Sequence, residues 1–167
     1  MRSATFRRAS ISARSVSRSA NAPSDNPDVV LVHRFLAAPD TPVAVNSNAL
    51  ARALGASLTG FDPATRTLAM RYVPEPLFRQ GAGVVQGGAL AAMLDFAMAF
   101  AGMATVDATI GLSTVTLNVV LQRPAVADAY EAVGRIDKAG RRAMFASAEI
   151  RAGSSVVATA TSTLLVV

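Results

Sequence analysis

The sequence predicts a single α+β domain in which an antiparallel β-sheet wraps around one long central helix. The first observation is the length, since 167 residues suit one domain that can bury a core without disulfides. The second is the segment at residues 87–105, which is rich in Ala, Met and Leu, lacks proline and is a strong helix former. The third is a set of runs rich in Val, Thr and Ile on both sides of that segment, which are typical of strands.

The order of the elements follows from capping and turn signals along the chain. Asn46 or Ser47 can cap a short helix that Gly55 would close. Asp62 followed by proline is typical of the turn between two strands of a hairpin. The predicted elements are a helix at 46–55, strands at 56–61 and 66–73, a glycine-rich loop at 80–86, the long helix, and strands at 110–123, 130–138, 141–152 and 155–167.

The charge is distributed unevenly, and it divides the chain into two parts. Residues 1–24 contain five Arg and no acidic residue, whereas residues 25–167 contain eleven basic and eleven acidic residues. We therefore expect residues 1–40 to be a disordered or loosely ordered basic segment and residues 41–167 to form the domain. The basic segment is also compatible with an organellar transit peptide. A single Lys against 15 Arg is typical of a GC-rich bacterial gene, which favours a tail on a cytoplasmic protein.

The composition excludes several classes of function. The absence of Cys excludes thiol catalysis and Cys-ligated metals, and His33 alone cannot build a multi-His metal site within one chain, so neither a metal nor a cofactor is expected. The neutral body lacks the basic stripe of a nucleic-acid binder. Residues 82–106 could span a bilayer, but their many Gly and Ala residues and a central Asp oppose insertion, so no membrane association is expected.

Asp95 is an isolated acidic residue in an otherwise apolar segment, and its position requires an explanation. It is the only ionisable residue between Arg79 and Asp107, and it lies in the middle of the predicted long helix. A carboxylate among apolar neighbours is costly unless it is paired, neutralised or used, so Asp95 is either a structural acid or a functional one. The Gly87–Gly88 pair favours a function. Bare backbone N–H groups at the start of a helix suit a carbonyl oxygen that becomes negative.

Several motifs together resemble those of the hotdog-fold acyl-CoA thioesterases, and most closely the phenylacetic acid degradation type. The resemblance is best over residues 80–125 and looser from about 45 to 167. It implies a hotdog fold and an enzyme that hydrolyses an acyl-CoA thioester to the free acid and CoA. The motifs that carry it are Gln80-x-x-Gly83-x-x-Gln86-Gly87-Gly88, Asp95, Gly111-Leu-Ser-Thr-Val-Thr-Leu-Asn118 and Leu121-Gln-Arg-Pro124.

The resemblance also implies a role for each candidate residue. Asp95 would be the nucleophile or the general base, and the Gly87 backbone N–H would bind the thioester oxygen. Gln80 would orient the carbonyl or the water, and Thr114 would lie near the attacking water. Thr114 shares an expected strand face with Thr116 and Asn118, for which ordinary strand chemistry is sufficient. The expected substrate-binding residues are Gln86, Gly88 and Arg123.

Helix geometry predicts that the site is shared between two subunits. Gly87 and Asp95 are eight residues apart, which is about 12 Å along one helix. One thioester carbon cannot lie about 3 Å from both groups, so Asp95 must act with Gly87 of a second subunit. We therefore expect a homodimer or a dimer of dimers. Small residues at helical spacing on the Asp95 face would let two helices pack closely: Gly88, Ala92, Ala99 and Gly102.

Gln86 departs from the family pattern and keeps alternatives open. The family usually has His before the two glycines, and Gln cannot transfer a proton near neutral pH. The main alternative is therefore a non-catalytic protein that binds acyl-CoA or another acyl thioester. A hotdog hydratase or dehydratase ranks last, because those enzymes place a His with the acid. The sequence does not define the acyl group or decide between coenzyme A and acyl carrier protein.

Overall fold

The computed structural model describes residues 25–167, so the expectations for residues 1–24 lie outside the described part of the chain. Within it, no helix is long and apolar enough to cross a membrane. The elements are α1 (Pro27–Phe35), β1 (Val43–Ala44), α2 (Ala49–Ala53), β2 (Ser57–Asp62), β3 (Thr67–Tyr72), the 3₁₀ helix η1 (Pro76–Phe78), α3 (Gly87–Met103), β4 (Leu112–Leu121), β5 (Tyr130–Ala139), β6 (Ala143–Ala152) and β7 (Ser155–Val166).

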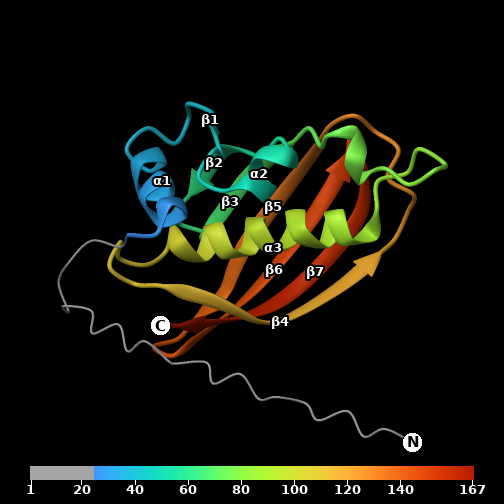
Figure 1. Cartoon of the computed structure of the whole chain (residues 1–167). Coiled ribbons are helices and arrows are strands. Elements are labelled where there is room, and N and C mark those ends of the chain that lie inside the picture. Colours follow the sequence, from blue (N-terminus) through green and yellow to red (C-terminus); the bar gives the residue numbers. More distant parts are fainter. Residues whose placement is uncertain (1–24) are drawn as a thin grey trace, which may run out of the picture.

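The strands form one antiparallel sheet that curves around α3 (Figure 1), which confirms the predicted α+β hotdog fold. The strand order is β1-β2-β3-β5-β6-β7-β4. The strand β4, which follows α3 in the chain, therefore lies at the edge of the sheet next to β7 and not next to β3. The predicted helices at 46–55 and 87–105 and all six predicted strands are present, with ends shifted by a few residues. The two-residue strand β1 and η1 were not predicted, because they carry too few residues for a pattern.

The helix α3 lies close to β5 at Ala97, because β5 has a glycine beneath it. A Cβ added to Gly134 would lie 2.1 Å from the carbonyl oxygen of Ala97, so a side chain at this position would collide with the α3 backbone. Close approach lets most of α3 enter the core. Its buried residues are Ala89, Leu90, Met93, Leu94, Ala97, Met98, Phe100, Ala101, Gly102 and Met103.

The domain begins before residue 41, where we expected it to start. The helix α1 packs against α3 and places Val29, Val32 and Phe35 in the core, each at most 1% exposed. The Asn26 side chain caps this helix by accepting a hydrogen bond from the Asp28 backbone N–H at 2.9 Å. The sequence does not predict this helix. The apolar run at residues 29–36 offers only three core-facing residues, which is a weak helical signal.

The start of α2 corrects the predicted cap. Asn48, rather than Asn46 or Ser47, caps the helix, and its side chain accepts a hydrogen bond from the Ala51 N–H at 2.8 Å. The hydroxyl of Ser47 instead donates to the carboxylate of Asp28. The Asn48 amide donates to the same carboxylate at 3.0 Å, so α1 and α2 are joined through one acid.

We expect Gly134→Ala to lower the free energy of unfolding by about 1–3 kcal/mol, the usual cost of overpacking. The added methyl group must push α3 away from β5 at Ala97. Urea unfolding measures the change, with Gly60→Ala as the matched control in the same sheet. A Cβ at Gly60 meets only the Ala69 methyl, at 3.8 Å. Equal losses in the two variants would contradict this account of the helix seat.

Candidate functional site

A pocket of about 410 Å³ lies where α3 begins. Its walls come from the loop that precedes α3 and from the segment that follows β4. The apolar lining residues are Val84, Val85, Leu90, Leu121, Pro124 and Ala125. The remaining lining residues are Gln80, Gln86, Gly87, Gln122 and Arg123. Four of the sequence-predicted site residues (Gln80, Gln86, Gly87 and Arg123) therefore meet at this pocket.

The loop that carries Gln80 is closed into a small hairpin by its own backbone. The Gln80 N–H donates to Val84 O at 2.8 Å, and the Gly83 N–H donates to Gln80 O at 2.8 Å. Gly83 has a φ of +79°, which a glycine adopts without strain. The Gln86 N–H donates to Phe78 O at 2.8 Å, so both ends of the hairpin are fixed. The side chain of Gln80 is thus presented to the pocket from an ordered backbone.

Gly87 is the first residue of α3, and its backbone N–H is available to a ligand. Among residues 25–167, none accepts a hydrogen bond from this N–H. The first N–H groups of a helix have no partner in the helix itself, and the macrodipole favours negative charge there. The Leu121 side chain lies over Gly87, with its Cδ1 2.6 Å from where a Cβ would be. The absence of a side chain at Gly87 therefore leaves room for Leu121 beside the N–H.

Asp95 lies further along α3 and is held by the edge strand. Asp95 is half-buried, and its Oδ1 accepts a hydrogen bond from the hydroxyl of Thr114 in β4 at 2.9 Å. Tyr72 lies beneath it and donates its hydroxyl hydrogen to Met93 O at 2.8 Å. Burial first, and then the charge of Asp95, raise the pKa of the Tyr72 phenol well above its usual range. Tyr72 therefore stays protonated and keeps fixing the α3 backbone two residues before Asp95.

A β-bulge in β4 turns Thr114 toward α3. The register of β4 against β7 shifts between Thr114 and Thr116, which leaves Val115 as the extra residue. Thr114 then pairs with the buried Leu164 and faces α3, while Asn118 lies on the opposite face of the sheet. The expectation that Thr114 shares a strand face with Thr116 and Asn118 is therefore wrong. Bulges often re-aim a side chain beside an active site, and this one delivers Thr114 to Asp95.

The predicted site residues thus form two groups within one chain. Gly87 lines the pocket at the start of α3, whereas Asp95 and Thr114 do not. Gly87 and Asp95 are eight positions apart in α3, about 12 Å along the axis. Gly88 is exposed and belongs to neither group. Arg123 lines the pocket, and its guanidinium donates a hydrogen bond to Val156 O at 2.7 Å.

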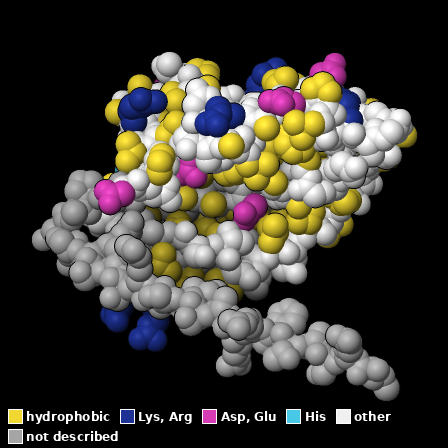
Figure 2. All heavy atoms as spheres, viewed as in Figure 1, with side chains coloured by type: hydrophobic (Ala, Val, Ile, Leu, Met, Phe, Trp, Pro, Cys, Tyr) yellow, Lys and Arg dark blue, Asp and Glu magenta, His cyan; other side chains and the backbone are white. Residues whose placement is uncertain are grey.

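One residue of the expected helix-contact face is in the core instead. Gly102 is buried, and a Cβ there would lie 2.7 Å from Leu112 Cδ1 and 2.9 Å from Leu164 Cδ1. The prediction that Gly102 faces a second helix is therefore wrong, since it faces the sheet. The exposed or half-buried positions of α3 are Gly87, Gly88, Ala91, Ala92, Asp95, Phe96 and Ala99. On the side of the molecule that carries α3, hydrophobic side chains form exposed patches with single acidic side chains between them (Figure 2).

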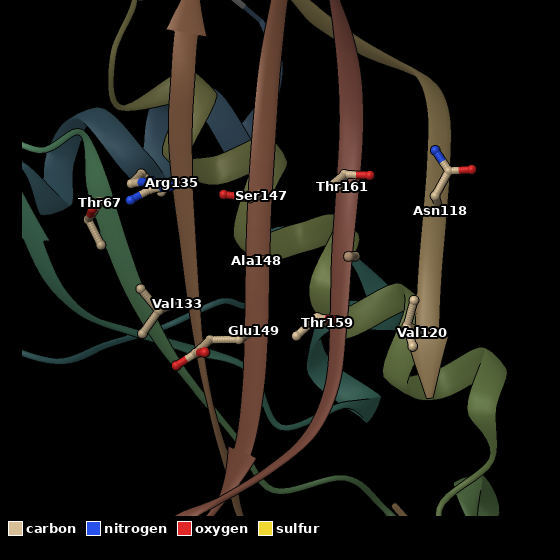
Figure 3. Close-up of a pocket in the computed structure, with 11 residues that line it drawn as sticks. Thr67, Asn118, Val120, Val133, Arg135, Ser147, Ala148, Glu149, Thr159 and Thr161 are labelled. Atoms are coloured by element: carbon tan, nitrogen blue, oxygen red, sulfur yellow. The ribbon is translucent and has the colours of Figure 1, made fainter. Parts of the chain in front are cut away.

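A larger hollow, about 540 Å³, lies on the opposite face of the sheet (Figure 3). Its lining alternates hydroxyl, amide, charged and small apolar side chains from β3, β4, β5, β6 and β7. Ser147 and Arg135 both contact the Asp137 carboxylate, at 3.1 Å and 2.8 Å. None of the sequence-predicted site residues lines it. We therefore place the candidate chemistry at α3 rather than in the larger hollow.

Comparisons with known proteins agree with the fold. The family model described as the thioesterase superfamily matches residues 82–159. A phenylacetic acid degradation-related protein from Ralstonia eutropha JMP134 is 33% identical, with a TM-score of 0.71 over 80% of this chain and 98% of that one. The chain belongs to the thioesterase superfamily.

Other solved structures share the hotdog fold of the thioesterase superfamily at lower identity. The PaaI protein of the E. coli phenylacetic acid degradation operon is 16% identical, with a TM-score of 0.67 over 86% of this chain and 96% of that one. The BH2602 protein of Bacillus halodurans, solved with CoA, is 23% identical, with a TM-score of 0.57 over 59% and 66%. No functionally curated protein sequence matches the chain.

The sequence did not point to three residues that shape the candidate site. Gln122 and Leu121 line the pocket, and both stand in the Leu-Gln-Arg-Pro motif, of which only Arg123 was singled out. Tyr72 lies 23 residues before Asp95, and no local pattern joins them. The motif could have indicated the first two residues, whereas only the fold brings Tyr72 under α3.

Proposed function

We propose that the protein is an acyl-CoA thioesterase whose active site is shared between two subunits of a homodimer. The single observation that carries the proposal is the separation of Asp95 from the pocket that contains Gly87. The Gly87 N–H has no acceptor among residues 25–167 and is open to a ligand, and Asp95 is held by Thr114, yet one chain does not bring the two groups to the same bond. A two-fold axis that places Asp95 of one subunit near Gly87 of the partner subunit completes two equivalent sites.

The edge strand β4 is the surface that supports such a dimer. Within residues 25–167 it pairs only with β7, so ten residues of backbone have one edge open. Val115, Val120 and Leu121 on this strand are each more than half exposed. A long open edge is a template for pairing with another strand, and two copies of β4 would pair antiparallel about a two-fold axis.

The same axis would set the two α3 helices side by side in opposite directions. If Asp95 is opposite the partner's Gly87, the helices cross at the midpoint of these positions, which is Ala91. Ala91 and Ala92 are half-buried, and apart from its two neighbours and the backbone of its own helix, Gly88 has no atom within 4 Å of where its Cβ would be. Small side chains at the crossing would let the backbones approach closely.

The proposed reaction begins with the thioester carbonyl oxygen bound to the N–H of the partner's Gly87. Asp95 then either takes a proton from the water that attacks the carbon or attacks the carbon itself, in which case water hydrolyses the resulting anhydride. The carbonyl oxygen becomes negative and is stabilised by the N–H and the helix dipole. In the general-base route, collapse breaks the carbon–sulfur bond and releases the free acid and CoA, whose thiolate takes up the proton that Asp95 removed from the water. In the nucleophilic route, collapse releases the CoA thiolate and leaves the anhydride; water then hydrolyses the anhydride to the free acid and the Asp95 carboxylate, and the thiolate takes up the proton that this step releases.

Neighbouring side chains would orient the reacting groups without transferring protons. The Thr114 hydroxyl holds Oδ1 of Asp95, and no described residue bonds Oδ2, which is therefore the oxygen we assign to the water or the thioester carbon. Gln80 and Gln86 would hydrogen-bond the substrate at the pocket wall. Arg123 would bind a CoA phosphate at the rim. The Bacillus halodurans relative solved with CoA supports a CoA thioester as the substrate.

We expect Asp95→Asn to lower kcat by at least about 100-fold, because a positioned acid or base contributes about 10²–10⁴-fold. Asn keeps the acceptor for Thr114 and removes only the carboxylate chemistry. Hydrolysis of short, medium, long and aromatic acyl-CoAs provides the measurement, and Asp137→Asn on the opposite face of the sheet is the control. Unchanged hydrolysis by Asp95→Asn would refute the mechanism. Acyl-CoA binding without turnover by the unaltered protein would favour the non-catalytic alternative.

We expect Gly87→Pro to lower kcat about 10²–10³-fold, the usual cost of one missing oxyanion donor. Proline removes the N–H but suits the first position of a helix, and Gln86 already has a compatible backbone, with φ −58° and ψ 139°. Gly87→Ala is the matched control, since it meets the same Leu121 side chain and keeps the N–H. Equal activity of the two variants in the acyl-CoA assay would count against the oxyanion role.

A further inference from the structure

Arg79 makes a cluster of contacts just outside the pocket. Its side chain is 23% exposed. Nη1 donates to Gly83 O at 2.9 Å, and Nη2 donates to Ala127 O at 2.8 Å and to the Asp128 carboxylate at 2.9 Å. The guanidinium thus joins two segments that are 44 residues apart in the chain, from Gly83 to Ala127. The planar guanidinium carries several N–H donors at fixed angles, which lets one side chain bind all three acceptors together.

These two segments are the walls of the pocket. The hairpin at residues 79–86 carries Gln80 and leads into Gly87, and the segment at residues 122–128 carries Gln122 and Arg123. The backbone joins the walls directly through one hydrogen bond, from the Val85 N–H to Ala125 O at 2.8 Å. That bond lies next to the start of α3. At the tip of the hairpin, the contact that fixes the distance between the walls is the Arg79 side chain.

We propose that Arg79 is a positioning residue that sets the width of the pocket and the place of the Gln80 side chain. The inference rests on the proposed function for its consequence in catalysis, although the clamp itself stands on the contacts alone. Arg79 does not line the pocket, so it acts through the hairpin rather than on the substrate. Loss of the clamp frees the hairpin tip at Gly83 while the Val85 tie and α3 remain in place.

The clamp depends on the carbonyl contacts more than on the ion pair. The Asp128 side chain is 99% exposed, and exposed ion pairs contribute little because water screens them. The two carbonyl groups, by contrast, belong to the walls themselves. Arg79→Lys keeps the charge and can still pair with Asp128, but one ammonium group cannot bridge both carbonyls with the geometry of the fork.

The test compares Arg79→Met and Arg79→Lys with Asp128→Asn and with Arg135→Gln, which breaks an exposed ion pair on the opposite face. We expect both Arg79 variants to lose about 10-fold or more in kcat, since a misplacement of about 1 Å can cost 100-fold. We expect KM to change less than kcat, and Asp128→Asn and Arg135→Gln to stay within about twofold of the unaltered protein. If Arg79→Met does not fold, Arg79→Lys decides. Activity of Arg79→Lys within twofold of the unaltered protein would overturn the proposal, as would equal losses in the Arg135→Gln variant.

Hydrogen exchange of the peptide at residues 79–86 gives a readout that does not require activity. We expect the protected N–H groups of Gln80 and Gly83 to exchange faster in Arg79→Lys, with exchange in α3 unchanged. If the unaltered protein hydrolyses no acyl-CoA, the proposed function fails while this measurement still tests the clamp. Unchanged exchange at residues 79–86 would show that Arg79 does not hold the hairpin.

Discussion

The close contact between α3 and β5 is the constraint on which the rest of the structure depends. Gly134 lets the α3 backbone reach the sheet at Ala97, and this contact fixes where every residue of the helix lies along the sheet. Gly87 then falls beside Leu121 at the mouth of a pocket, and Asp95 falls beside Thr114. The positions of both groups are therefore consequences of how the core is packed.

Packing of α3 also accounts for the division of the active site that we propose. The buried side of the helix is filled by large apolar residues, while its outer side is reduced to Gly, Ala, Asp95 and Phe96. In the proposed dimer, these small residues let the helix of the second subunit approach this side closely. The open edge of β4 lies next to it, so a single two-fold operation could cover the edge and bring two divided sites together.

The long helix, the hairpin and the four later strands could be predicted from the sequence because each has a local signal. The helix α1 could not, since Val29, Val32 and Phe35 are buried only because α3 lies beside them. Gly87 and Asp95 were recognisable from a glycine pair and a lone acid. The orientation of Thr114 was not, because a bulge at Val115 reverses the alternation that the strand pattern predicts. The contacts of Arg79 could not be predicted either, because its partners at residues 127 and 128 are far away in the sequence and only the fold brings them to it.

The most direct test of the shared site is to mix two inactive variants. Asp95→Asn and Gly87→Pro would be unfolded together in equal amounts and refolded so that subunits exchange. In a mixed dimer, Asp95 of one chain meets an intact Gly87 from the other at one of the two sites. Random pairing should then restore about a quarter of the unaltered activity toward acyl-CoA. If both groups act within one chain, every site keeps one defect, and the mixture would remain as inactive as its components.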